Sequence, residues 1–139
     1  MEYLGLGQTD LQVSRLCFGT WSFGGDWGAV EVEESKAAVR KALDLGINFF
    51  DTAQAYGFGA AERMLGEALS PEVAAHRHGV VLATKGGLRM EGNVVVRDSS
   101  PAWLRQGLEA SLRALGTDYI DLYQIHWPDP ETPFEQTAR

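Results

Sequence analysis

Short runs of apolar residues recur along this chain, and each run ends abruptly at a polar residue or a glycine. The four clearest runs lie at residues 15–19, 47–50, 79–84 and 119–125. Each is too short for an ordinary helix, which is typical of a buried strand. Two further short segments, 3–5 and 11–13, flank the turn-forming residues 7–10 and predict a hairpin that precedes the four strands.

Between these runs, apolar residues recur every three or four positions, which is the spacing of one face of a helix. This pattern predicts helices at residues 32–45, 61–69 and 101–115. A glycine follows the first and the third of them and is expected to terminate each. Ser70 and Pro71 are expected to end the second helix. Ser100, followed by Pro101, is predicted to be the N-cap of the third.

Strands and helices therefore alternate, with a fourth strand after the third helix. This alternation predicts an α/β protein in which parallel strands are joined by crossover helices. Residues 86–99 are predicted to form a long polar loop without regular structure. No stretch of the chain has the composition of an interdomain linker or of a low-complexity segment.

The sequence near the C-terminal end predicts the start of a further helix. Thr132, Pro133 and Glu135 fit a capping box, with the threonine as N-cap and the proline at the first helical position. Only about one turn of that helix precedes Arg139, and one turn does not sustain itself because helix nucleation is unfavourable. We therefore expect the sequence to be cut off within a longer fold.

Composition and charge narrow the classes of partner. The chain has 139 residues, 45% of them hydrophobic, and a formal net charge of −7, which together indicate one acidic domain. The excess of negative charge argues against nucleic acid or an anionic membrane as partner. No apolar run approaches the roughly 18 residues that a membrane span needs. Because no export signal is visible and only one cysteine is present, we expect a cytoplasmic protein.

Two other residue types raise the question of reactive or metal-binding sites. Cys17 lies within an apolar run, so we interpret it as a buried, inert thiol. His76 and His78 lie just before the third predicted strand, and so at its N-terminal end. Neither has a set of cysteines or carboxylates nearby, so no metal site is expected there.

Three of the four predicted strands end at an ionisable residue: Asp51, Lys85 and His126. Tyr56 lies in the glycine-flanked loop after the first of these. In parallel α/β folds, active sites gather beyond the C-terminal ends of the strands, so we expect these four side chains to converge.

These four residue types suit one kind of chemistry. A free phenol has a pKa near about 10, so it donates a proton poorly at neutral pH. A neighbouring ammonium group favours the phenolate, and a carboxylate can orient that ammonium. An imidazole can form a hydrogen bond to a substrate oxygen. Together they suit protonation of a carbonyl oxygen while a hydride arrives at the carbonyl carbon.

These residues lie in motifs that resemble the N-terminal half of an aldo-keto reductase. The motifs are D-T-A-Q-A-Y-G at 51–57 with Glu62 shortly after, A-T-K at 83–85, and D-L-Y-Q-I-H-W-P-D at 121–129. The opening L-G-Q-T-D-L-Q-V-S-R-L-C-F-G-T-W, at 6–21, also matches the start of that family. The resemblance extends over essentially the whole chain.

The resemblance implies a fold and a set of site residues. The fold is the (β/α)4 half of a TIM-type (β/α)8 barrel, preceded by a β-hairpin. Residues 1–139 would form this half and end in the first turn of the fourth helix; a complete barrel needs about 250 residues. The implied catalytic residues are Asp51, Tyr56, Lys85 and His126. Tyr56 would be the general acid. Asp51 and Lys85 would tune its acidity, and His126 would orient the carbonyl. Trp21 and Trp127 would wall the substrate pocket.

The cofactor implied by the resemblance is NADP(H), with Gly19, Thr20 and Asp51 on the cofactor side and a small carbonyl compound as substrate. Members of the family hold the nicotinamide and the adenine-side phosphate mostly with the second half of the barrel, which these 139 residues do not contain. Two functions therefore stay open. One is NADPH-dependent reduction of aldehydes or ketones, or the reverse oxidation. The other is a catalytically silent half-barrel that serves as a scaffold or binding module.

Simpler interpretations of the same residues also exist. Asp51 and Lys85 could form a structural ion pair, and Tyr56 could be a packing residue of its loop. A charged pair at a strand end does not by itself indicate a function, because ion pairs without a function also perturb pKa values. Lys85 could instead form a Schiff base. A paired Asp51 would keep the lysine protonated and work against that reaction.

The expected half-barrel also predicts self-association. Its first and fourth strands would be open edges, which invite pairing with another chain. The inward side chains of Phe49, Val81 and Leu122 would be exposed. Two copies that meet edge to edge could supply eight strands, so we predict a homodimer or a larger homo-oligomer.

Overall fold

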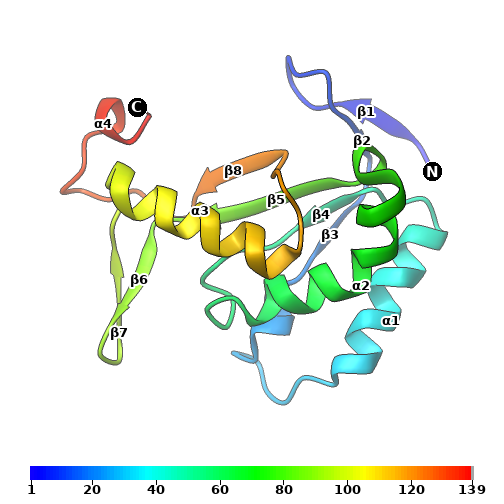
Figure 1. Ribbon diagram of the computed structural model, residues 1–139, viewed down its shortest axis with the longest axis horizontal. Coiled ribbons are helices and arrows are strands. Elements are labelled where there is room, and N and C mark those ends of the chain that lie inside the picture. Colours follow the sequence, from blue (N-terminus) through cyan, green and yellow to red (C-terminus); the bar gives the residue numbers. More distant parts are fainter. Residues whose placement is uncertain (139) are drawn as a thin grey trace.

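Four parallel strands form the centre of the molecule (Figure 1). The computed structural model describes residues 1–138, and the strands are β3 (Cys17–Gly19), β4 (Phe49–Asp51), β5 (Val81–Gly86) and β8 (Leu122–Ile125). They lie side by side in the order β3-β4-β5-β8. A hairpin of β1 (Tyr3–Gly5) and β2 (Gln12–Ser14) precedes them, as predicted.

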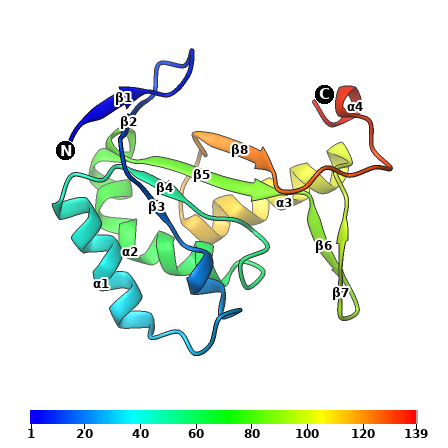
Figure 2. The same ribbon diagram turned by 180° about the vertical axis from the view of Figure 1, so that it is seen from behind.

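Three helices connect these strands: α1 (Val32–Asp44), α2 (Ala60–His76) and α3 (Pro101–Leu115). All three lie on the same side of the sheet in both views (Figures 1 and 2). Their apolar faces enclose the core with one face of the sheet, where Phe50, Leu65 and Leu82 are at most 1% exposed. Burial of one such side chain stabilises the fold by about 1.5–3 kcal/mol.

The helix boundaries follow from local chemistry. Ser100 is the N-cap of α3, where its hydroxyl accepts a hydrogen bond from the Trp103 N–H, and Pro101 opens the helix as predicted. Gly66 lets α2 approach α3 closely, because a Cβ atom at this position would lie 2.6 Å from the Leu115 carbonyl oxygen.

The prediction that Ser70 and Pro71 end α2 was wrong, because the helix continues to His76. A proline cannot donate the backbone hydrogen bond to the residue four positions earlier. Here that acceptor is the carbonyl of Glu67, and the Ser70 hydroxyl donates to it instead, at 3.0 Å. The side chain next to the proline thus satisfies the group that the proline leaves free.

The polar loop expected at residues 86–99 is instead a second hairpin, of β6 (Leu88–Glu91) and β7 (Val94–Arg97). It extends away from the sheet (Figure 1). Only two residues, Gly92 and Asn93, connect the strands, and Gly92 adopts a positive φ of 60°. A two-residue turn of this kind selects a hairpin, and the polarity of the segment concealed that signal.

The predicted capping box near the C-terminal end does not form. The N-cap of α4 (Phe134–Thr137) is Pro133, and the Thr132 hydroxyl donates to the Asp129 carboxylate instead of capping the helix. Arg139 lies outside the described residues.

The last strand is also shorter than expected and begins at Leu122. The Asp121 side chain accepts a hydrogen bond from the Leu82 N–H and pairs with Arg77. The Asp121 carboxylate thereby takes the place of a backbone carbonyl as the acceptor for the Leu82 N–H.

Two expectations about burial also need correction. Cys17 is exposed on the outermost strand β3, although partial burial of its sulfur raises the thiol pKa to about 11. Val81 was expected to be exposed, but it is only 4% exposed. Phe49 and Leu122 are half-buried. None of the helices in residues 1–138 has the length and hydrophobicity to cross a bilayer.

Candidate active site

The predicted site residues lie along one edge of the parallel sheet. Asp51 is the last residue of β4, Lys85 lies near the end of β5, and His126 directly follows β8. Side chains alternate between the two faces of a strand. Asp51 and Lys85 therefore lie on the face opposite to Phe50, which packs against the helices.

The ammonium group of Lys85 is the centre of the cluster. Its Nζ lies 2.7 Å from Oδ2 of Asp51, 2.9 Å from the carbonyl oxygen of Thr52 and 3.3 Å from the phenolic oxygen of Tyr56. These three contacts use all three N–H donors of a lysine. The position of the ammonium is therefore fixed, and it lies next to the phenol.

His126 completes the cluster from the last strand. Its ring lies 5.5 Å from the Tyr56 ring, centroid to centroid, at an angle of 88°, and its backbone N–H donates to the Gly86 carbonyl. Burial, and then the charge of Lys85, lowers the pKa of the His126 imidazole. A lowered pKa keeps this side chain neutral at neutral pH.

Tyr56 owes its position to two glycines. Gly57 adopts a positive φ of 61°, and a Cβ atom there would lie 2.6 Å from the carbonyl oxygen of Gly24. The two loops therefore touch through their backbones. This contact brings Trp21 onto the Tyr56 ring, with ring centroids 6.2 Å apart and the planes inclined by 26°.

A cavity of about 380 Å³ opens beside these residues. Its lining includes both predicted pocket residues and two of the predicted catalytic residues, and it consists of Trp21, Asp26, Ala55, Tyr56, Phe58, Leu88, Val95, His126 and Trp127. Sequence reasoning missed Leu88 and Val95 because it did not predict their hairpin. It also missed Asp26 and Phe58, which lie in loops without a distinguishing pattern. A second cavity, of about 500 Å³ between α3, β8 and α4, contains none of the predicted site residues.

The predicted cofactor residues have different surroundings. Gly19 is exposed at the end of β3. Thr20 is fully buried, and both its N–H and its hydroxyl donate to the Asp51 carbonyl, at 3.0 and 3.3 Å. The structure therefore places Thr20 where it fixes the backbone of Asp51.

Two buried polar atoms near the site, Oε1 of Gln124 and Nδ1 of His126, have no hydrogen-bond partner within the described residues. Gln124 pairs with Lys85 across β5 and β8. These atoms fit the polar end of a bound nicotinamide. Asp26 is the charged residue of the cavity lining, and no lysine or arginine of the described chain joins it there to hold cofactor phosphates. The fit to a dinucleotide is thus limited to its reactive end.

Within residues 1–138, no three His, Cys, Asp or Glu side chains are grouped as they would be around a metal ion. The rings of His76 and His78 lie 6.4 Å apart, at the end of α2 that leads into β5.

A family model described as the aldo/keto reductase family matches residues 15–139. The chain belongs to this family. Aldo-keto reductase YhdN of Bacillus subtilis (strain 168) is 45% identical to it over 139 residues, covering 99% of this chain and 41% of the relative. A probable voltage-gated potassium channel subunit beta of Oryza sativa subsp. japonica is 37% identical over 143 residues, covering 100% of this chain and 41% of the relative.

The fold agrees with that assignment. The holo form of aldo-keto reductase AKR11C1 from Bacillus halodurans superposes with a TM-score of 0.85 at 38% identity, covering 99% of this chain and 44% of that chain. The predicted fold class, half of a (β/α)8 barrel after an N-terminal hairpin, is confirmed. This aldo/keto reductase chain spans about two fifths of the length of the curated relatives it matches.

Proposed function

We propose that this aldo/keto reductase chain interconverts carbonyls and alcohols, with Tyr56 as the proton donor. One observation carries the proposal: Nζ of Lys85 contacts both the Asp51 carboxylate and the Tyr56 hydroxyl, at 2.7 and 3.3 Å. A structural ion pair alone would not require the phenol to lie beside the ammonium. The same arrangement argues against a Schiff base, because the nitrogen that would attack a carbonyl is held by three contacts within the site.

The proposed roles follow from these contacts. When Tyr56 gives its proton to a carbonyl oxygen, negative charge develops on the phenolic oxygen. The fixed ammonium of Lys85 stabilises that charge without having to reorganise, and preorganised stabilisation of this kind is usually the largest contribution to catalysis. Asp51 and the Thr52 carbonyl hold the ammonium in place.

His126 and the pocket walls act on the substrate. A neutral imidazole can form a hydrogen bond to the carbonyl oxygen without competing with Tyr56 as the acid, and the lowered pKa of His126 provides this neutral form. Trp21 and Trp127 line the cavity beside Tyr56 and offer flat apolar surfaces to the carbon skeleton. The cavity excludes part of the solvent from the reacting atoms.

The proposed cofactor is NADP(H), which when bound supplies the hydride that reduces the carbonyl carbon. Gly19 and Asp51 at the strand ends and Gln124 on β8 would hold its nicotinamide end. Aldo-keto reductases generally use a nicotinamide cofactor, in agreement with the family assignment. Thr20 would contribute through the backbone of Asp51.

The experiment that tests the proposal begins with binding. NADPH is titrated into the 139-residue chain and its fluorescence is followed; turnover of an aromatic aldehyde is then measured through the loss of NADPH absorbance. We expect saturable binding and turnover. Tyr56→Phe should reduce turnover by roughly 10²–10⁴-fold because it removes the proton donor, while circular dichroism and the melting temperature stay unchanged. Equal rates for Tyr56→Phe and the parent chain would contradict the proposal.

A second candidate function is a cofactor-binding module without turnover. It is favoured by the relative from Oryza sativa, which is described as a probable voltage-gated potassium channel subunit beta. Saturable NADPH binding without turnover of any aldehyde, ketone or alcohol would support this function. Absence of binding at millimolar NADPH would favour a scaffold that binds no cofactor.

A further inference from the structure

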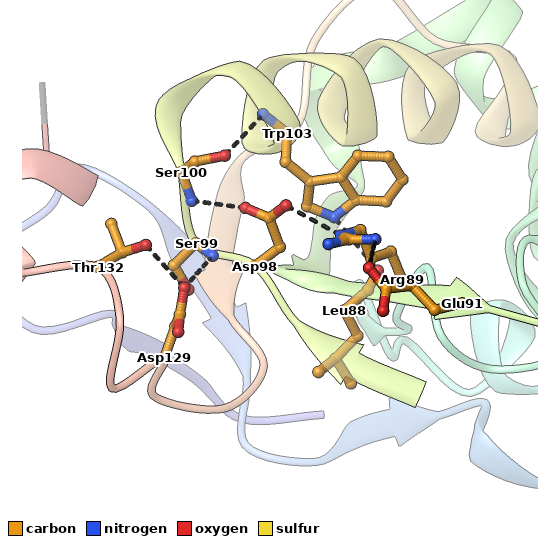
Figure 3. Close-up of polar contacts among 9 residues, drawn as sticks. All are labelled: Leu88, Arg89, Glu91, Asp98, Ser99, Ser100, Trp103, Asp129 and Thr132. Atoms are coloured by element: carbon orange, nitrogen blue, oxygen red, sulfur yellow. Dashed lines mark hydrogen bonds and ion pairs between the residues drawn. The ribbon is translucent and has the colours of Figure 1, made fainter. Parts of the chain in front are cut away.

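A buried carboxylate fastens the turn after β8 to the start of α3 (Figure 3). Oδ2 of Asp129 accepts hydrogen bonds from the Ser99 N–H at 2.9 Å and from the Thr132 hydroxyl at 2.7 Å. Its Oδ1 accepts a third from the Glu131 N–H at 2.9 Å. These bonds, led by the one from Ser99, lower the pKa of the Asp129 carboxyl, so the group is charged at neutral pH.

An arginine provides a second attachment of the same turn. Arg97, the last residue of β7, donates to the Pro128 carbonyl at 3.1 Å, and its guanidinium lies 5.3 Å from the centre of the Trp127 ring. The turn after β8 is therefore attached at Pro128 and at Asp129, one and two residues beyond Trp127.

The hairpin is held to the start of α3 by its own contacts (Figure 3). Asp98 accepts from the Ser100 N–H at 3.1 Å and from Nε of Arg89 at 3.0 Å. The indole N–H of Trp103 donates to the Leu88 carbonyl at 3.3 Å. The hairpin, the first turn of α3 and the turn after β8 thus form one hydrogen-bonded unit.

This unit carries two walls of the candidate active site. Leu88 and Val95 of the hairpin line the cavity, as do His126 and Trp127. Asp129 does not line the cavity. Its carboxylate joins the turn that follows Trp127 to Ser99, between the hairpin and α3. We propose that Asp129 is a positioning residue for carbonyl reduction, which holds Trp127 and His126 in register with the β6–β7 hairpin. This inference rests on the proposed function for its catalytic meaning, but its geometry can be tested without turnover.

The test compares three variants of the full chain. Asp129→Asn keeps the size of the side chain but replaces one acceptor oxygen with an N–H₂ group, which cannot accept from these donors. Thr132→Val removes a single donor at nearly constant volume and is the milder change if Asp129→Asn fails to fold. Glu131→Gln is the control, because Glu131 is an exposed carboxylate of the same turn that enters the network through its backbone N–H.

Two readouts report the position of the site without cofactor. The first is the ¹⁹F spectrum of the chain labelled with 5-fluorotryptophan, in which Trp127→Phe identifies the Trp127 resonance. The second is the pKa of His126 from an NMR titration. Asp129→Asn should shift or broaden the Trp127 resonance and leave that of Trp21 in place. It should also raise the His126 pKa toward its ordinary value, because a loosened turn admits water to the ring.

The outcomes separate this inference from the proposed function. Thr132→Val should show the same changes with smaller size, and Glu131→Gln should show none. A folded Asp129→Asn or Thr132→Val chain with an unchanged Trp127 resonance and an unchanged His126 pKa would overturn the inference, whether or not the parent chain turns over substrate. Where turnover is measurable, we expect kcat/KM to fall by roughly ten- to a hundredfold in Asp129→Asn, because a small displacement of His126 and Trp127 would misalign the substrate with the reacting groups.

Discussion

At the scale of single residues, Lys85 connects the other members of the cluster. Its ammonium contacts Asp51, Thr52 and Tyr56, and its side chain is only 17% exposed. Lys85→Met keeps the length of the aliphatic chain and removes the charge. If the ammonium stabilises the phenolate, this variant should lose at least about tenfold in turnover.

The matched control for that variant is Lys41→Met on α1. Lys41 lies near the end of that helix, away from the site. Lys41→Met should retain the rate of the parent chain. An unchanged rate in Lys85→Met would mean that the lysine forms only a structural ion pair with Asp51.

Residue chemistry could be predicted from the sequence where a side chain directly follows an apolar run. Asp51, Lys85 and His126 were found in this way, and the structure brings them together with Tyr56. Asp129 was not found, because the bond that ties it to another segment comes from the Ser99 N–H, which only the tertiary fold brings near; its bonds from Glu131 and Thr132 lie within its own turn. Nothing in the local sequence distinguishes a carboxylate that fastens two segments from one that faces solvent.

At the scale of elements, helix α2 is joined to strand β5 through a buried carboxyl group. Glu62 is only 1% exposed, and its Oε1 accepts a hydrogen bond of 2.6 Å from the Thr84 hydroxyl. Burial raises the pKa of the Glu62 carboxyl, and the bond from Thr84 only partly offsets this. The folded state therefore binds the proton more tightly than the unfolded state.

This difference predicts how stability depends on pH. Above the ordinary Glu pKa of about 4.3, the unfolded chain loses the proton more readily, so stability falls as pH rises toward the folded-state pKa. Glu62→Gln keeps an acceptor for Thr84 and cannot become charged. It should raise the free energy of unfolding by about 1 kcal/mol near pH 8, and the gain should vanish at acid pH. Urea unfolding at several pH values measures this, with the exposed Glu34→Gln as control.

Elements were predictable where one pattern decided them. The four parallel strands and the helices α1 and α3 follow from apolar spacing and from capping residues. The end of α2 was mispredicted because the Ser70 hydroxyl donates to the Glu67 carbonyl, which Pro71 leaves without a backbone donor. Helix preferences of single residues do not include such a contact. The β6–β7 hairpin was missed because its three consecutive valines stand within a polar segment.

At the scale of the whole molecule, the sheet is open on both sides. Within residues 1–138, strands β3 and β8 each have one neighbour, whereas an eight-stranded barrel has no edge. The face of the sheet that carries Asp51 and Lys85 has no helices over it within the described chain (Figure 2). We propose that a second copy covers this face and pairs with these edges, so that the chain is a homodimer or a larger homo-oligomer.

Sedimentation of the 139-residue chain at micromolar concentration tests this proposal. We expect a mass of at least twice 15.2 kDa and an interface that buries well over about 1,000 Å². Leu122→Lys puts a charge on the half-buried inner face of β8 and should shift the mass toward that of one chain, because a lysine ammonium is costly to bury in an apolar contact. Leu45→Lys, at the exposed end of α1, should leave the mass unchanged. A parent chain that sediments as a monomer and melts cooperatively would show that four strands and their helices are stable alone, and the edges of β3 and β8 would then need no partner.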